Sequence, residues 1–149
     1  MPICCTPANL ASLADDLLQL EPGSEAHYRA SCSRAYYAAY HALEPLLQLV
    51  PGDQDGIGPQ GGLKHREVPR RLRKIQSLPM QLARLRRYAG EGKKAAFLFQ
   101  AALDSREQAD YLMSDPVPRE EVELQLGRMR DLLMFAERLR DELDRLNSQ

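Results

Sequence analysis

Arg34 and His41 are the two residues of this chain whose types and spacing could together perform chemistry. They stand seven positions apart, nearly two helical turns, so in a helix they project from the same side, roughly 10 Å apart along the axis. Histidine exchanges protons near neutral pH, and arginine keeps a charge that binds phosphate. Such a pair could cleave RNA through the RNA's own 2′-hydroxyl. The spacing also fits a structural arrangement, with His41 buried against a tyrosine and Arg34 paired with an acid.

Other kinds of active site find little support in the sequence. Histidine occurs three times, and no Glu-x-x-His pair, three-ligand metal set or GxxxxGK loop is visible. Cys4, Cys5 and Cys32 are odd in number and lack CxxC spacing, which argues against a disulfide framework or a zinc site. We therefore expect no metal and no cofactor.

The basic residues are concentrated in the middle of the chain. Between Lys64 and Lys94 stand eleven basic residues and two acids, which gives this segment a charge of +9 and leaves −10 for the rest of a chain whose net charge is −1. Such a segment suits phosphate groups or an acidic partner. The alternative is a solvated helix face neutralised by acids of neighbouring helices. The candidate RNA-binding residues are Lys64, Arg66, Arg70, Arg71, Arg73 and Lys74.

Helices must position these side chains, because apolar residues recur every three or four positions and no strand pattern is present. Thr6 is a suitable N-cap for a helix over 7–20, which Pro22-Gly23 ends. Ser24 caps a second helix that runs to about residue 50. This helix is rich in Ala and Tyr and is interpreted as the centre of a bundle, since small residues let other helices pack closely.

Glycine and proline divide the rest of the chain. Residues 51–62 are expected to form a mobile loop, and Gly90 and Gly92 are expected to break the chain again. Further helical segments are predicted at residues 63–77, 79–88, 93–113 and 119–146. The fold class is therefore all-α: a single domain over residues 1–149, built as a bundle of about five helices. No apolar run nears the roughly 18 residues of a membrane helix, and the first residues lack a signal peptide's features, so a cytoplasmic location is expected.

Three segments resemble the HEPN-domain proteins of prokaryotes. Residues 33–42 (SRAYYAAYHA) are similar to the second helix of that family. Leu63-Lys64-His65 stands where the family often places a histidine at a helix start. Arg106-Glu107-Gln108-Ala109-Asp110-Tyr111 is similar to an element of the family's later long helix. Order and spacing agree for all three, and the resemblance covers about residues 7–145.

The resemblance implies a helical bundle that forms a homodimer and acts in toxin–antitoxin, phage-defence or RNA-processing systems. Many members are metal-independent endoribonucleases with an arginine, four to six residues and a histidine, a count that Arg34 and His41 fit. It implies RNA as the target and a cognate antitoxin or a nucleotidyltransferase as a possible partner. Catalytic roles then fall to Arg34 and His41, with support from Tyr37, His65, Arg106, Asp110 and Tyr111.

Two questions stay open at this level. Some HEPN proteins are non-catalytic modules for dimerisation or for nucleotide or partner binding, and Ala35 in an Ala-rich central helix favours that interpretation, which predicts a buried Arg34–His41 region. Asp110 stands four residues after Arg106 and either pairs with it along the helix or reaches the second helix to orient Arg34 or His41.

Overall fold

The computed structural model describes residues 5–20 and 23–149, and in this part of the chain all regular elements are helices. The α-helices are α1 (Pro7–Gln19), α2 (Glu25–Leu47), α3 (Glu67–Leu72), α4 (Ala89–Tyr111) and α5 (Arg119–Asn147). Short 3₁₀ helices occupy η1 (Gln54–Gly56), η2 (Ile75–Ser77) and η3 (Met80–Tyr88). The predicted all-α bundle of five helices is confirmed, with four long helices and one short one.

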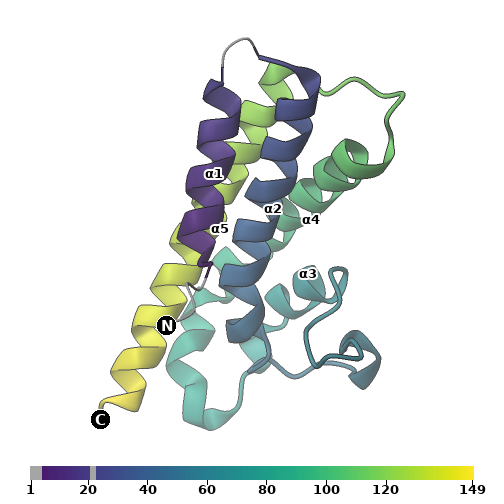
Figure 1. Ribbon diagram of the computed structural model, residues 1–149. Coiled ribbons are helices and arrows are strands. Elements are labelled where there is room, and N and C mark those ends of the chain that lie inside the picture. Colours follow the sequence, from purple (N-terminus) through teal and green to yellow (C-terminus); the bar gives the residue numbers. More distant parts are fainter. Residues whose placement is uncertain (1–4, 21–22) are drawn as a thin grey trace.

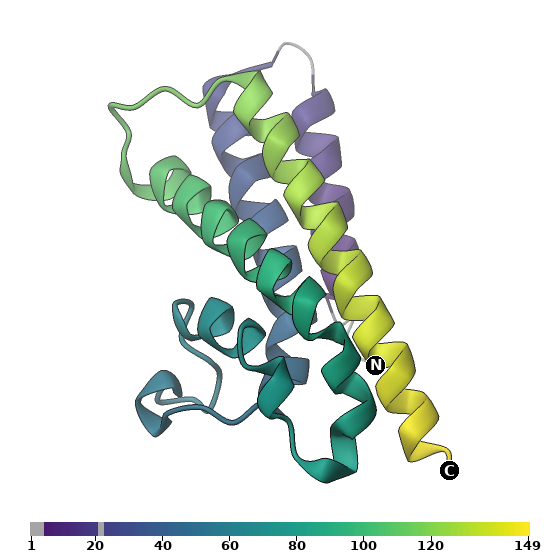
Figure 2. The same cartoon turned by 180° about the vertical axis from the view of Figure 1, so that it is seen from behind.

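The long helices form one bundle around α2 (Figures 1 and 2). α1, α2 and α5 run side by side, while α4 crosses at an angle and α3 lies under it with the preceding loop. α2 contacts α1, α3, α4 and α5, which confirms the central place predicted for it. The helices that the structure describes include none that combines the length and hydropathy needed to cross a bilayer.

The starts of α1 and α2 follow the predicted capping signals. The Thr6 hydroxyl accepts from the backbone of Asn9 at 3.1 Å, and the Asn9 side chain accepts from the Thr6 backbone at 2.9 Å, which makes a reciprocal capping box. The Ser24 hydroxyl accepts from the His27 backbone at 3.3 Å. Pro22, predicted to help end α1, and Cys4 lie outside the described residues.

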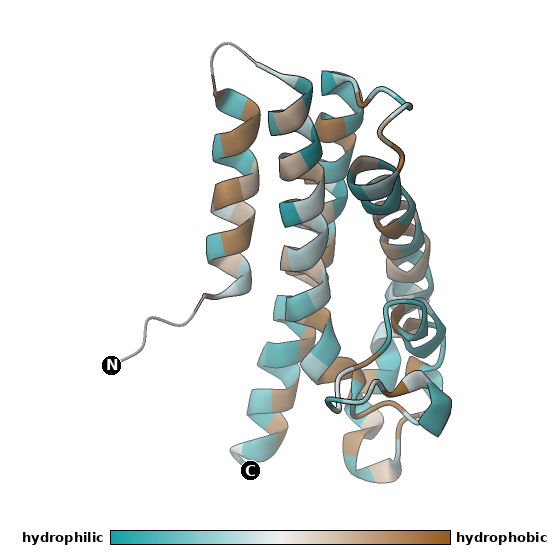
Figure 3. Cartoon of the chain, turned by 45° about the vertical axis from the view of Figure 1, so that its right-hand side comes forward, coloured by the Kyte–Doolittle hydropathy of each residue, from teal (hydrophilic) through white to brown (hydrophobic). Residues whose placement is uncertain are grey.

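The core explains why α2 is so rich in small residues. Ala35, Ala38 and Ala39 are fully buried, so α1, α4 and α5 can approach its backbone closely. The larger of two apolar clusters surrounds Tyr36 and Phe99, and each such ring contributes about 1.5–3 kcal/mol on burial. Hydrophobic and hydrophilic residues alternate along the helices, as amphipathic helices require (Figure 3).

The start of α4 differs from the prediction that Gly90 and Gly92 break the chain. Both glycines lie inside α4, which begins at Ala89 directly after η3. Gly92 is buried, and a Cβ at this position would lie 2.6 Å from the Leu72 carbonyl oxygen. The glycine is therefore a packing residue that brings α4 onto the end of α3.

Gly92→Ala is expected to lower the free energy of unfolding by about 1–3 kcal/mol, because the added methyl must displace backbone. Gly127→Ala in α5 is the matched control. A Cβ there meets no atom within 4 Å, so the substitution should raise stability by about 0.5–1 kcal/mol through helix propensity. Urea unfolding of both variants measures the difference. Equal effects would contradict the packing role of Gly92.

Residues 51–62, predicted to be a mobile loop, contain the 3₁₀ turn η1 and several backbone hydrogen bonds. Gly58 donates to the Gly62 carbonyl at 2.7 Å, and Gly61 has a φ of 85°, a conformation that favours glycine. Ile57 and Leu63 form an isolated antiparallel bridge. The backbone amide of Leu63 also donates to Glu44 of α2 at 3.2 Å, which joins the end of the loop to the bundle.

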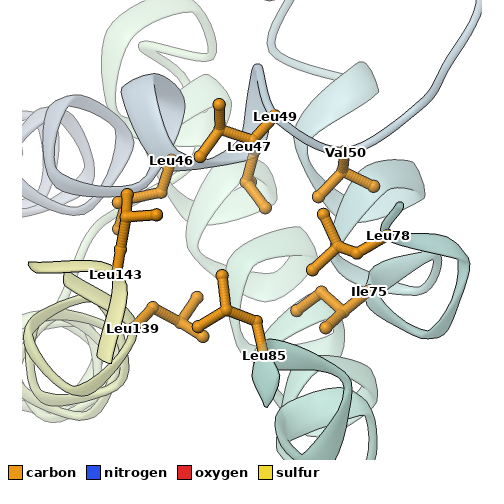
Figure 4. A pocket seen from close by; sticks show the side chains of 9 residues that line it. All are labelled: Leu46, Leu47, Leu49, Val50, Ile75, Leu78, Leu85, Leu139 and Leu143. Atoms are coloured by element: carbon orange, nitrogen blue, oxygen red, sulfur yellow. The ribbon is translucent and has the colours of Figure 1, made fainter. Parts of the chain in front are cut away.

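An apolar cavity lies where the ends of α2, η2, η3 and α5 converge (Figure 4). Aliphatic side chains line it, among them Leu47, Ile75 and Leu139. Its volume is about 20 Å³, close to the space that one water molecule needs. A cavity of this size and lining is a packing feature of the core.

Candidate functional site

Arg34, Tyr37 and His41 form a row on one side of α2, as their spacing predicted. The Arg34 guanidinium carbon lies 5.6 Å from the centre of the Tyr37 ring. The Tyr37 and His41 rings are stacked, with centres 6.1 Å apart and planes at 26°. Arg34 and Tyr37 are half-buried and His41 is exposed. Tyr37 therefore separates a cationic end of the row from an imidazole end.

The row lines an open pocket between α2 and the start of α1. Thr6, Pro7 and Leu10 form the opposite wall, so the capping box of α1 shapes the pocket directly. An adjoining pocket between α2 and α5 shares Pro7 and His41. His41 thus stands where two open pockets meet, accessible to a ligand in either.

The alternative structural arrangement for this pair does not occur. In the described part of the chain, Arg34 forms no ion pair and His41 is exposed. The buried Arg34–His41 region expected of a non-catalytic module is also absent. Different residues take these structural roles: His65 is the histidine bonded to a tyrosine, and Arg106 is the arginine paired with an acid.

Tyr37 connects most of the remaining candidate residues. Arg106, which is 8% exposed, donates from Nη2 to the Tyr37 hydroxyl at 2.6 Å and to the Tyr111 hydroxyl at 3.3 Å. His65 meets the Tyr37 ring edge-on at 6.1 Å between centres. α2, α4 and the segment before α3 therefore bring four of the other six predicted catalytic and supporting residues into contact with Tyr37: Arg34, His41, His65 and Arg106.

Of the two arrangements left open for Asp110, the structure shows the pairing with Arg106, and within the described residues Asp110 has no ion pair with Arg34 or His41. Its carboxylate lies 2.9 Å from Arg106 Nε, one turn earlier on α4, and accepts from the Ser33 hydroxyl at 3.3 Å. Ser33 is adjacent to Arg34 in sequence but points about 100° away around the helix. Asp110 therefore fixes Arg106, and through it the Tyr37 ring.

His65 is held by the buried Tyr36, with Tyr36 Oη 2.5 Å from His65 Nδ1. Burial raises the pKa of the Tyr36 hydroxyl, so this hydroxyl stays protonated and donates. His65 Nδ1 is then the acceptor, and the proton of the neutral ring sits on Nε2. Burial, together with the charge of Arg106, lowers the pKa of His65 from its ordinary value of 6.5. His65 is consequently neutral near pH 7 and acts as a structural acceptor.

The lowered pKa of His65 predicts an acid-sensitive fold. The unfolded chain binds a proton near pH 6.5 and the folded chain only at lower pH, so stability is present above pH 6.5 and declines as the pH falls toward the folded pKa. The loss from one such group is at most about 1.4 kcal/mol per pH unit. Urea unfolding at about pH 7.5 and about pH 5.5 measures it. His65→Asn, which keeps an acceptor for Tyr36, should show a shallower decline; an identical decline would contradict the assignment.

Tyr40 was not among the predicted site residues, although it belongs to the same tyrosine-rich motif. Its hydroxyl donates to the Leu63 carbonyl at 2.6 Å, and its ring centre lies 4.7 Å from that of His65. The spacing of Tyr36, Tyr37 and Tyr40 could have indicated this, because the three rings share one side of α2. Tyr36 and Tyr40 fix the segment before α3, which carries His65 and Lys64.

The basic segment divides into exposed and buried parts. Arg71 is buried and binds Glu67 at 3.1 Å and the Val50 carbonyl at 3.0 Å, so its prediction as an RNA-binding residue was wrong. The reason is that α3 turns this side toward the end of α2. The other five predicted RNA-binding residues are exposed: Lys64, Arg66, Arg70, Arg73 and Lys74. Among these five, only Arg70 has an acid within ion-pair distance in the described part of the chain.

Comparisons with known proteins return no relative: no family model, curated protein or solved structure matches the chain.

Within residues 5–20 and 23–149, no group of three or more His, Cys, Asp or Glu side chains is placed to hold a metal ion. Cys5 is exposed and Cys32 is buried, and both are free thiols. The chemistry available to the site therefore rests on Arg34, Tyr37 and His41.

Proposed function

We propose that this chain is a metal-independent endoribonuclease whose catalytic residues are His41 and Arg34. One observation supports this most strongly. A guanidinium without an acidic partner in the described chain and an exposed imidazole flank the same tyrosine in one open pocket. Arginines that serve the fold here have partners, as Arg71 and Arg106 do. A half-buried arginine left without one is suited to bind an anion from solution.

The reaction requires no group beyond these side chains and the RNA. His41 removes the proton of a 2′-hydroxyl, the 2′-oxygen attacks the adjacent phosphorus, and the bond from phosphorus to the 5′-oxygen breaks. The departing 5′-oxygen takes up a proton from water, and His41 releases the proton that it removed to water, so one proton is taken and one is returned. The products are a 2′,3′-cyclic phosphate and a 5′-hydroxyl. Arg34 stabilises the extra negative charge on the phosphoryl oxygens as the attack proceeds.

The exposed basic residues before, on and directly after α3 extend the surface available to RNA. Lys64 adjoins His65, which contacts Tyr37, and Arg66, Arg73 and Lys74 are exposed nearby in the chain. These side chains would neutralise backbone phosphates without reading sequence. RNA affinity should therefore fall steeply as salt is raised.

The HEPN resemblance supplies the proposed biological setting. It favours a homodimer in a toxin–antitoxin or phage-defence system, with a cognate antitoxin or a nucleotidyltransferase as partner. The alternative is a non-catalytic HEPN-like module for dimerisation or for nucleotide or partner binding. The contacts that Arg106, Asp110 and His65 make with residues of the bundle favour it, because these contacts belong to the fold and need no substrate.

Incubation of the purified protein with a mixed RNA substrate, with and without EDTA, separates the two functions. The ribonuclease should cut in both conditions and leave 2′,3′-cyclic phosphate ends. Cutting that EDTA abolishes would exclude the metal-free mechanism. A folded protein that leaves RNA intact would favour the module.

A further inference from the structure

Tyr111, the last residue of α4, exposes 67% of its surface although it is a large aromatic residue. Its position is nevertheless fixed. The Arg106 guanidinium carbon lies 5.3 Å from the centre of its ring, and Arg106 Nη2 donates to its hydroxyl at 3.3 Å. An exposed ring held by a buried arginine is presented to solvent in one orientation, so binding to it requires little further loss of side-chain freedom.

The same nitrogen of Arg106 places Tyr111 beside the row formed by Arg34, Tyr37 and His41. Arg106 Nη2 also donates to the Tyr37 hydroxyl, so both tyrosine hydroxyls lie within hydrogen-bond distance of one atom. Tyr37 in turn contacts Arg34 and His41. A strand whose phosphate reached Arg34 would therefore pass close to the Tyr111 ring.

We propose that Tyr111 stacks on a nucleobase beside the cleaved phosphate and so makes the site selective for single-stranded RNA. The location assigned to the base rests on the proposed ribonuclease function, whereas the stacking itself does not depend on cleavage. Aromatic side chains next to cations are how proteins bind unpaired bases, because every base offers a flat face. In a duplex both faces of a base are already covered by its neighbours.

A nucleic acid suits this surface better than a protein does. Leu112 and Met113 beside Tyr111 are exposed and apolar. However, Arg106 links Tyr111 to Tyr37, and the residues that contact Tyr37 are cationic or ionisable. Arg34 and, before α3, Lys64 have no acidic partner in the described chain. A protein contact centred on Tyr111 would leave these charges unused.

The test measures binding of a labelled oligouridine by fluorescence anisotropy, with His41→Ala present in every protein so that RNA stays intact. Tyr111→Ala should weaken binding by between about five- and 150-fold, the range of one lost stacking contact. Tyr111→Phe, which keeps the ring, should bind almost as the parent does. Phe97→Ala is the matched control, since Phe97 is an exposed aromatic residue on the same helix, 76% accessible and remote from Arg106.

Two further readouts separate stacking from charge. Tyr111→Ala should leave the salt dependence of binding unchanged, whereas Arg34→Ala should lower its slope by about 0.7, one phosphate contact to a single strand. The same RNA annealed to its complement should bind Tyr111→Ala and the parent equally. If Tyr111→Ala binds the single strand as tightly as the parent does, the proposal is overturned. The same holds if Tyr111→Ala no longer dimerises but keeps its RNA affinity. If Tyr111 stacks RNA but the protein with its native His41 leaves RNA intact in the cleavage assay, only the ribonuclease proposal is refuted.

Discussion

His41→Ala is expected to lower the rate of RNA cleavage by about 10²- to 10⁴-fold, the usual contribution of a positioned general acid or base. The imidazole is exposed at the junction of two pockets and stacked on Tyr37. No other histidine can replace it, because His65 is engaged with Tyr36 and His27 lies at the opposite end of α2. Cleavage of a labelled RNA under single-turnover conditions gives the rate.

The control is His27→Gln, which removes a histidine of the same helix and should cut at the parent rate. Because His41 is exposed, the melting temperature of His41→Ala should match that of the parent, with a stability change within about 0.5 kcal/mol. Loss of cleavage without loss of stability assigns the chemistry to His41. A His41→Ala protein that cuts at the parent rate would remove the proposed mechanism.

Arg29→Ala is expected to lower the free energy of unfolding by at least about 3 kcal/mol, because each buried carbonyl oxygen left without a donor costs about 1–3 kcal/mol. Arg29 is 9% exposed and pairs with Glu25 at 2.7 Å, and its hydrogen bond lowers the pKa of that carboxyl. Its guanidinium also donates to carbonyl oxygens at and beyond the end of α4: those of Gln108, Ala109, Leu112, Met113 and Asp115. Carbonyls at a helix end need donors from outside the helix, although the Gln108 and Leu112 oxygens also accept from the backbone of Leu112 and Asp115.

Removing the guanidinium takes one donor from each of these carbonyls and from Glu25, which then keeps only the Val117 backbone amide within the described residues. Arg29→Lys keeps the charge but has no planar fork, so its loss should lie between that of Arg29→Ala and zero. Arg130→Ala is the control: its ion pair with Asp15 is exposed and should contribute less than about 1 kcal/mol. Urea unfolding at neutral pH measures all three. Similar losses for Arg29→Ala and Arg130→Ala would contradict the capping role of Arg29.

Sequence by itself determined the starts of the first two helices and one side of the site. Apolar periodicity, Thr6 and Ser24 mark where α1 and α2 begin, because capping and amphipathicity are local properties. Helical geometry likewise places Arg34, Tyr37 and His41 on one side of α2 wherever that helix packs. These predictions hold because they depend on residues within a few turns of each other.

Tertiary structure alone decided which charged residues serve the fold and which remain available. Arg29, Arg71 and Arg106 look like Arg34 in sequence, but the packing of α2 against α3 and α4 gives the first three buried partners from distant segments. The packing also determines that the Tyr36 hydroxyl hydrogen-bonds His65 and not His41. Such pairings join residues 21 or more positions apart, and no local pattern encodes them. The physical reason is that a buried charge requires a partner, and only the folded backbone determines which groups are close enough.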